Sequence, residues 1–203
     1  MSRHANRRIF LRDTLLFSTG IVGGTALAST WSSLVDATQN KVFAKQDDKT
    51  SAEDRLHELG IELPPAPQPV AVYLPAVRNG NTLYASGHGP RRANGELIQG
   101  KVGADLTLEQ GYDAARVVGL NLLSTVRSTL GSLDKVVRLV KVLGMVNCTA
   151  DFTKQPQVIN GCSELMVQVF GENYGKGARS AVGMGSLPSN IAVEIEAIFE
   201  VRG

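Results

Sequence analysis

Alternating apolar and polar residues predict strands near both ends of the folded part of the chain. Residues 70–74 and 83–86 alternate in this way, and the turn-forming residues 79–81 between them indicate a β-hairpin. Residues 178–201 contain two further apolar segments, with a Leu-Pro-Ser-Asn turn at 187–190. These two segments therefore predict a second, closing hairpin.

Apolar residues at helical spacing predict two long helices and one short one. The strongest pattern follows Thr107, which forms a capping box with Gln110, and it stops before Gly131, a plausible C-cap. A second long helix is expected over 155–170, and a short one capped by Gly60 is expected within 52–63. The chain therefore has the helices needed to cover one face of a sheet.

The order of these elements favours a fold class. With a further β-branched strand at 136–146, the order is ββ-α-β-α-ββ. This order predicts an α+β fold, in which two helices cover one face of a mixed sheet. The other face must then meet water or another subunit. In the last strand, successive side chains point to opposite faces of the sheet. The face opposite to the continuous apolar one therefore holds Ala192, Glu194, Glu196, Ile198 and Glu200.

Two charged residues of the predicted closing hairpin, Arg179 and Glu194, need an explanation. Either both lie on a solvated face or they belong to a site. Folding the hairpin about Ser189 separates them by on the order of 13–15 Å, at about 3.3 Å per residue. They cannot form an ion pair within one hairpin. If they cooperate, a subunit interface has to bring the groups together.

Composition and charge indicate a globular domain without a basic surface. The 203 residues are 43% apolar and 20% charged, with a formal net charge of +2. Residues 52–203 alone hold 14 Lys and Arg against 15 Asp and Glu, a net charge of −1. Without a basic excess to neutralise phosphates, nucleic acid is not an expected partner.

The N-terminus has the features of an export signal. Adjacent arginines are followed by Ile9-Phe10-Leu11, an apolar middle and an Ala26-Leu27-Ala28 cleavage site. The segment resembles a twin-arginine signal peptide over residues 1–28, and the polar residues 29–51 predict a linker. We therefore expect a periplasmic or exported protein whose folded domain spans 52–203. A membrane association is expected only if the signal stays uncleaved.

Few residues are available for metal or redox chemistry. The two cysteines, Cys148 and Cys162, lack the paired spacing of a zinc site, and either a disulfide or two buried thiols is open. Outside the signal, only His57 and His88 are histidines. We expect no metal and no cofactor.

The C-terminal segment ARSAVGMGSLPSNIAVEIEAIFEV resembles the signature of the RidA (YjgF-like, endoribonuclease L-PSP) family. The similarity extends upstream through Leu83-Tyr84-Ala85-Ser86-Gly87, the Gly131–Val136 segment, Asp151-Phe152 and Asn160, and covers about residues 65–202. The resemblance implies a chorismate-mutase-like fold and a homotrimer with sites in the clefts between subunits. It also implies hydrolysis of reactive 2-enamine and 2-imine acids to 2-keto acids and ammonia.

The same resemblance implies roles for five residues. Arg179 matches the arginine that binds the substrate carboxylate, a task suited to a planar guanidinium. Glu194 matches the glutamate that positions or deprotonates the attacking water. Tyr73 and Ser86 match site residues, and Asn160 and Ser86 would supply hydrogen bonds. Each of these three also has an ordinary structural interpretation, as a strand aromatic, a turn residue or a helix amide.

Departures from the family pattern leave other functions open. Ala181 stands where the family often has cysteine, and His88 stands where glutamine is common, which places an imidazole near the expected pocket. A trimer that binds small carboxylates without catalysis is the main alternative. An endoribonuclease is less favoured, because neither a basic surface nor a histidine pair supports it.

Overall fold

The computed structural model describes residues 50–68 and 72–203. The predicted signal peptide and nearly all of the predicted linker lie outside these residues, so both stay predictions. Within the described residues, no helix has the length and apolar character needed to cross a membrane.

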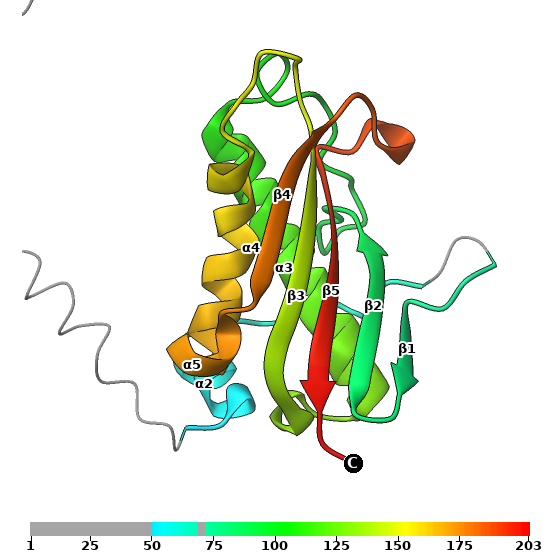
Figure 1. Ribbon diagram of the computed structural model, residues 1–203, viewed down its shortest axis with the longest axis vertical. Helices are drawn as coiled ribbons and strands as arrows, with labels where there is room; N and C mark the ends of the chain where they lie inside the picture. The colour runs from blue at the N-terminus through cyan, green and yellow to red at the C-terminus, as the bar shows by residue number, and fades with distance from the viewer. Residues whose placement is uncertain (1–49, 69–71) are drawn as a thin grey trace, which may run out of the picture. The chain divides into compact units, whose positions relative to one another are not determined.

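Five strands form one mixed sheet, seen in front of the helices in Figure 1. They are β1 (Ala76–Asn79), β2 (Thr82–His88), β3 (Val136–Asn147), β4 (Ala178–Met184) and β5 (Val193–Val201). Their order across the sheet is β1-β2-β5-β3-β4, and only β3 and β4 are parallel. The central position of β5 places its side chains between two neighbouring strands.

The helices agree well with the apolar pattern. They are α2 (Ala52–Glu58), α3 (Leu108–Leu130), α4 (Gln155–Phe170) and the single turn α5 (Glu172–Gly175). At the start of α3, Thr107 and Gln110 form the predicted capping box, and Gly131 ends the helix with a left-handed φ of 84°. Both long helices are therefore confirmed.

The core lies between α3, α4 and one face of the sheet. Residues Val193, Ile195, Ala197, Phe199 and Val201 of β5 are buried there, whereas Glu196 and Glu200 on the other face are exposed. The alternation predicted for the last strand is confirmed, and so is the α+β fold with two helices on one face. Over the residues that the structure describes, no helix covers the second face of the sheet (Figure 1).

The predicted closing hairpin is wrong. The turn at Pro188–Asn190 exists, but β4 and β5 do not pair, because β3 lies between them. Two apolar strands separated by a turn have the same sequence pattern whether they pair or whether a third strand lies between them. Local alternation cannot distinguish these arrangements.

The first strand also differs from the prediction. The hairpin begins at Ala76, after Pro75, and its turn is Gly80-Asn81. The predicted strand covered residues 70–74. Of these, residues 72–74 are not in a strand, and residues 70 and 71 lie outside the described residues. Proline has no N–H for a strand ladder, so the ladder begins beyond it. The carbonyl of Pro75 still accepts a bond from the Ser86 N–H at 2.9 Å. The preceding segment is thus held beside β2.

Candidate functional site

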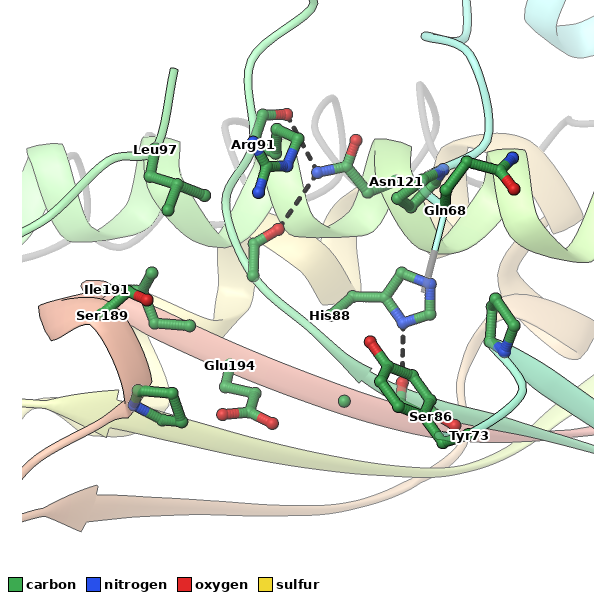
Figure 2. Close-up of a pocket in the computed structure, with 15 residues that line it drawn as sticks. Gln68, Tyr73, Ser86, His88, Arg91, Leu97, Asn121, Ser189, Ile191 and Glu194 are labelled. Carbon is green, nitrogen blue, oxygen red and sulfur yellow. Dashed lines mark hydrogen bonds between the residues drawn. The ribbon is translucent and has the colours of Figure 1, made fainter. Parts of the chain in front are cut away.

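A pocket of about 600 Å³ lies where β2 and β5 meet the loops around them (Figure 2). Its walls come from the end of β2, the start of β5, one residue of α3, residues 67, 68, 73 and 75, the 89–97 loop and the Pro188–Ile191 turn. Two hydrogen bonds from residues 99 and 100 hold this turn: Gln99 Nε2 donates to Ser189 O at 2.6 Å, and Gly100 N donates to Asn190 O at 2.8 Å. Segments distant in sequence therefore build one cavity.

Glu194 reaches this pocket beside an irregularity in β2. Ala85 pairs with Ala197, but His88 pairs with Ile195, so β2 has one residue more than β5 over this stretch. This bulge contains Gly87, on which a Cβ would overlap Oε1 of Glu194 and lie 3.0 Å from its Cδ. Gly87 is required because only a residue without a side chain leaves room for the carboxylate.

The environment of Glu194 changes its acidity. Burial raises the pKa of the half-buried carboxyl above its usual range, and the negative charge of Glu196 raises it further. A carboxylate with a raised pKa is a better proton acceptor than an exposed one. Its position suits a general base.

Two predicted site residues, Tyr73 and Ser86, line the same pocket (Figure 2). Tyr73 is 45% exposed. The hydroxyl of Ser86 donates to Leu74 O at 2.7 Å. Its proton is committed to that carbonyl, so Ser86 offers a ligand its lone pairs. It is suited to accept a hydrogen bond from an N–H group of a ligand.

His88 also borders the pocket, but its ring is engaged within the protein. Nδ1 lies 2.6 Å from Ser86 O and Nε2 lies 2.8 Å from Thr125 Oγ1. Because a carbonyl only accepts, Nδ1 carries the proton and Nε2 accepts from Thr125. Burial lowers the pKa of His88, and the bond to Ser86 opposes this only in part. A neutral His88 therefore braces the bulge from the side of α3.

Sequence reasoning missed two pocket residues, Arg91 and Asn121. Asn121, on α3, is 3% exposed and donates to Gly89 O at 3.1 Å and to Arg91 O at 3.0 Å. Figure 2 shows its amide between these two carbonyls. A polar residue on the sheet-facing side of an amphipathic helix was the signal available in the sequence.

Arg179 and Asn160, the other predicted site residues, lie elsewhere. Arg179 is on the edge strand β4, exposed, and its Nη1 donates to Asn160 Oδ1 at 2.8 Å and to Ser163 Oγ at 3.1 Å, both on α4. Asn160 and Ser163 therefore orient the guanidinium. The sequence indicated Asn160, but it did not point to Ser163.

The structure separates Arg179 from Glu194 within one chain. Arg179 shares a row of the sheet with Val142 and Ala197, so it is two strands and three residues away from Glu194. With strands about 4.8 Å apart and about 3.3 Å per residue, the separation is roughly 14 Å. Arg179 also bonds to α4 on the helix side, whereas Glu194 alternates with buried residues and points to the other side. The predicted separation holds, although its cause is β3 and not the length of a hairpin.

Neither cysteine is suited to catalysis. Cys148 and Cys162 are buried free thiols. Burial raises the pKa of Cys162 to about 12, against the opposing charge of Arg179, so the thiol is protonated at neutral pH. The described residues also contain no group of three or more His, Cys, Asp or Glu side chains that could hold a metal ion.

The fold and the site place the protein among chorismate-mutase-like α+β proteins. The family described as "YjgF/chorismate_mutase-like, putative endoribonuclease" matches residues 53–197. The chain therefore belongs to the YjgF (RidA-like) family.

Individual relatives carry different names. Protein TCP17 of Trypanosoma cruzi is 42% identical over 147 residues, 72% of this chain and 92% of the relative. A 2-iminobutanoate/2-iminopropanoate deaminase of Dermatophagoides farinae is 31% identical over 143 residues, 70% and 95% of the two chains. The crystal structure of protein Atu1372 from Agrobacterium tumefaciens, 41% identical, has a TM-score of 0.68 over 76% of this chain and 96% of that one.

Proposed function

We propose that the protein hydrolyses 2-imine and 2-enamine acids to 2-keto acids and ammonia. The site would be shared between subunits of a homotrimer, an assembly common in this family. One chain supplies the pocket with Glu194, and a neighbour supplies Arg179. Export to the periplasm is part of the proposal and rests on the twin-arginine-type signal alone.

The observation that carries this proposal is that each half of the site is incomplete by itself. The pocket holds a carboxyl with a raised pKa, a serine oxygen and a tyrosine, and its one cation among the described lining residues, Arg91, lies on a different wall from Glu194 (Figure 2). The edge at β4 holds an oriented, exposed guanidinium, and no carboxylate among the described residues forms an ion pair with it. A second copy of the chain would bring its Arg179 to the pocket that contains Glu194 of the first copy.

The chemistry needs only water and proton transfer. Glu194 accepts a proton from water as the oxygen attacks the imine carbon, and the carboxyl then gives that proton to nitrogen. The carbinolamine collapses as its hydroxyl proton also passes to nitrogen, the C–N bond breaks and ammonia leaves. Ser86 accepts a hydrogen bond from the nitrogen, and Arg179 holds the carboxylate bidentately. One water is consumed and no redox step occurs.

Two alternatives make different predictions. A trimer that binds small carboxylates without turnover would use Arg179 and leave Glu194 dispensable. An endoribonuclease, as the family description suggests, would need a base and a phosphate-binding surface. The net charge of −1 over residues 52–203 disfavours it, and His88 has both ring nitrogens engaged. The deaminase therefore has the best support.

Mixed trimers test the shared site directly. Arg179→Ala and Glu194→Gln chains are co-expressed with different affinity tags, and trimers that carry both tags are purified. In a cyclic trimer of either composition, one cleft in three combines an intact Arg179 with an intact Glu194, so about one third of wild-type activity should return. The assay follows 2-keto acid release from 2-iminobutanoate generated in situ.

Two controls define the outcome. Each variant alone, carried through the same two-tag procedure and assayed at a substrate concentration below KM, should retain at most about a tenth of wild-type activity. Activity in neither wild type nor mixed trimers would exclude deamination of this substrate. A fully active wild type with inactive mixed trimers would place both residues in the same subunit's site, and light scattering of the wild type reports independently whether it is a trimer.

A further inference from the structure

Arg91 is a cation in the Glu194 pocket to which the proposed reaction assigns no task. Among the described residues that line the pocket, it is the only lysine or arginine, and Glu194 is the only acidic residue. Figure 2 shows the two on different walls of the cavity, with Arg91 on the side of α3. The pocket is thus electrically polarised before Arg179 of another subunit is considered.

The protein fixes Arg91 in place. Asn121 holds its carbonyl, an isolated β-bridge joins it to Leu97, and its own Nη1 donates to Gly95 O at 2.8 Å. The loop between them is closed by the bond from Ile98 N to Pro90 O at 3.0 Å. A guanidinium on a braced loop loses less conformational entropy on binding than one on a free side chain.

Much of the guanidinium remains available to a ligand. Over residues 50–68 and 72–203, Nη1 is the only guanidinium nitrogen of Arg91 with a hydrogen bond, and the ion pairs there are Arg127–Glu53 and Lys176–Glu172. Nε and Nη2 are therefore left with the geometry that pairs with a carboxylate. A second substrate carboxylate entering this pocket would otherwise meet the negative charge of Glu194.

We propose that Arg91 binds a second carboxylate on the substrate, so that the preferred substrates are imines of dicarboxylic amino acids. This inference rests on the proposed function: Arg179 of one subunit takes the carboxylate beside the imine, and Arg91 of the other takes the distal one. Arg91 is a specificity-determining residue, and the hydrolysis itself does not require it.

The test compares substrates with one and two carboxylates. An amino-acid oxidase generates 2-iminobutanoate or 2-iminoglutarate in situ, and wild type, Arg91→Met and Arg92→Met are assayed with both. Arg91→Met should lower kcat/KM for 2-iminoglutarate about tenfold to a hundredfold more than for 2-iminobutanoate, chiefly through KM. Arg92, the next residue, does not line this pocket, so Arg92→Met should keep the wild-type ratio.

Three results would overturn the assignment: an equal loss on both substrates, no loss on either, or the same change in Arg92→Met. A further variant, Arg91→Lys, keeps the positive charge but loses the planar group that binds a carboxylate bidentately. It should therefore restore only part of the wild-type ratio of kcat/KM for 2-iminoglutarate to kcat/KM for 2-iminobutanoate.

Binding of the stable 2-keto acids separates this inference from the proposed function. If wild type turns over neither imine, calorimetry with 2-ketoglutarate and 2-ketobutanoate still tests Arg91. The wild type should bind 2-ketoglutarate at least about tenfold more tightly, and Arg91→Met should remove that preference. Failure to bind either acid, or a preference that survives Arg91→Met, would reject the second carboxylate site.

Discussion

The Glu194 pocket and the Arg179 edge are built from the same sheet in opposite ways. The pocket depends on an irregular part of β2, a bulge that His88 braces from α3 and Gly87 keeps open. The edge depends on regular structure, since a parallel strand and a helix present Arg179, Asn160 and Ser163 at close range. The pocket half-buries its acid and thereby changes the pKa of that acid, while the edge is exposed and keeps a permanent charge.

This difference matches the two tasks that we propose. Proton transfer gains from a desolvated group with an adjusted pKa, whereas carboxylate capture needs a strong, oriented charge that meets a substrate from outside. The roughly 14 Å between them within one chain means that neither half can compensate for loss of the other. The variants below should therefore separate catalysis from binding.

Glu194→Gln should have the largest effect. Gln keeps the size of the side chain but cannot accept the proton, so kcat should fall by about 100-fold to 10,000-fold with little change in KM. Steady-state kinetics on 2-iminobutanoate measure both constants. A KM effect without loss of kcat would assign Glu194 to binding and erase the contrast between the two regions.

Arg179→Ala should act on binding. Loss of the charge-assisted bonds to the carboxylate should lower kcat/KM by about tenfold to a hundredfold, mostly as a rise in KM. Ser163→Ala, which removes one of the two groups that orient the guanidinium, should produce a smaller change in the same direction. A drop in kcat at unchanged KM would contradict the assignment.

Gly87→Ala should impair activity more than stability. The added methyl overlaps the end of the Glu194 side chain, which can swing aside without moving the backbone, but the carboxylate then leaves its position. We expect a loss of about tenfold or more in kcat, since small displacements of catalytic groups are costly. The matched control is Gly185→Ala, where a Cβ meets nothing within 4 Å. Thermal melts should be similar for both; a strongly destabilised Gly87→Ala would make Gly87 a folding residue.

The pH profile should report the environment of Glu194. Because burial and the charge of Glu196 raise the pKa of Glu194 above 4.5, the base is protonated and inactive at pH values where an exposed glutamate is ionised. The acid limb of kcat/KM should therefore lie above pH 4.5. Glu196→Gln removes one cause and should move the limb to lower pH, whereas the more distant Glu200→Gln should not. An equal shift in both variants would indicate a general surface-charge effect.

His88 should give the smallest effect, on stability. Its lowered folded pKa means that the unfolded chain binds a proton more readily, so stability is complete above the ordinary value of 6.5 and declines as pH falls below it. His88→Gln, which can still donate to Ser86 and accept from Thr125, should reduce this acid-side loss. Denaturant unfolding at several pH values measures it, with the exposed His57→Gln as control. The same slope in wild type and His88→Gln would contradict a neutral buried imidazole.

The long helices were predictable because their signals are local. Thr107, Gln110 and Gly131 define α3 through contacts within one turn of the helix, and the alternation in β5 reports which face is buried. Pairing between β4 and β5 was predicted incorrectly because the turn at 187–190 does not reveal that β3 lies between them. The candidate roles of Arg179 and Glu194 came from resemblance, and their separation was estimated correctly from a wrong arrangement.

The remaining pocket residues could not be found from their positions in the sequence. Arg91 and Asn121 are 30 residues apart and meet because a loop folds back onto α3. His88 was expected near the pocket, yet its hydrogen bonding depends on Thr125, which the pattern of α3 did not single out.

The sequence by itself determined the α+β class, the limits of the two long helices, the buried face of the last strand and the family, because each depends on periodicity, capping or a contiguous motif. Only the tertiary structure decided that β3 separates β4 from β5, that a bulge places Gly87 against Glu194, and that Arg91 enters the same pocket. The physical reason is that strand order and bulges arise from pairing between distant segments, whose free energies no local pattern records.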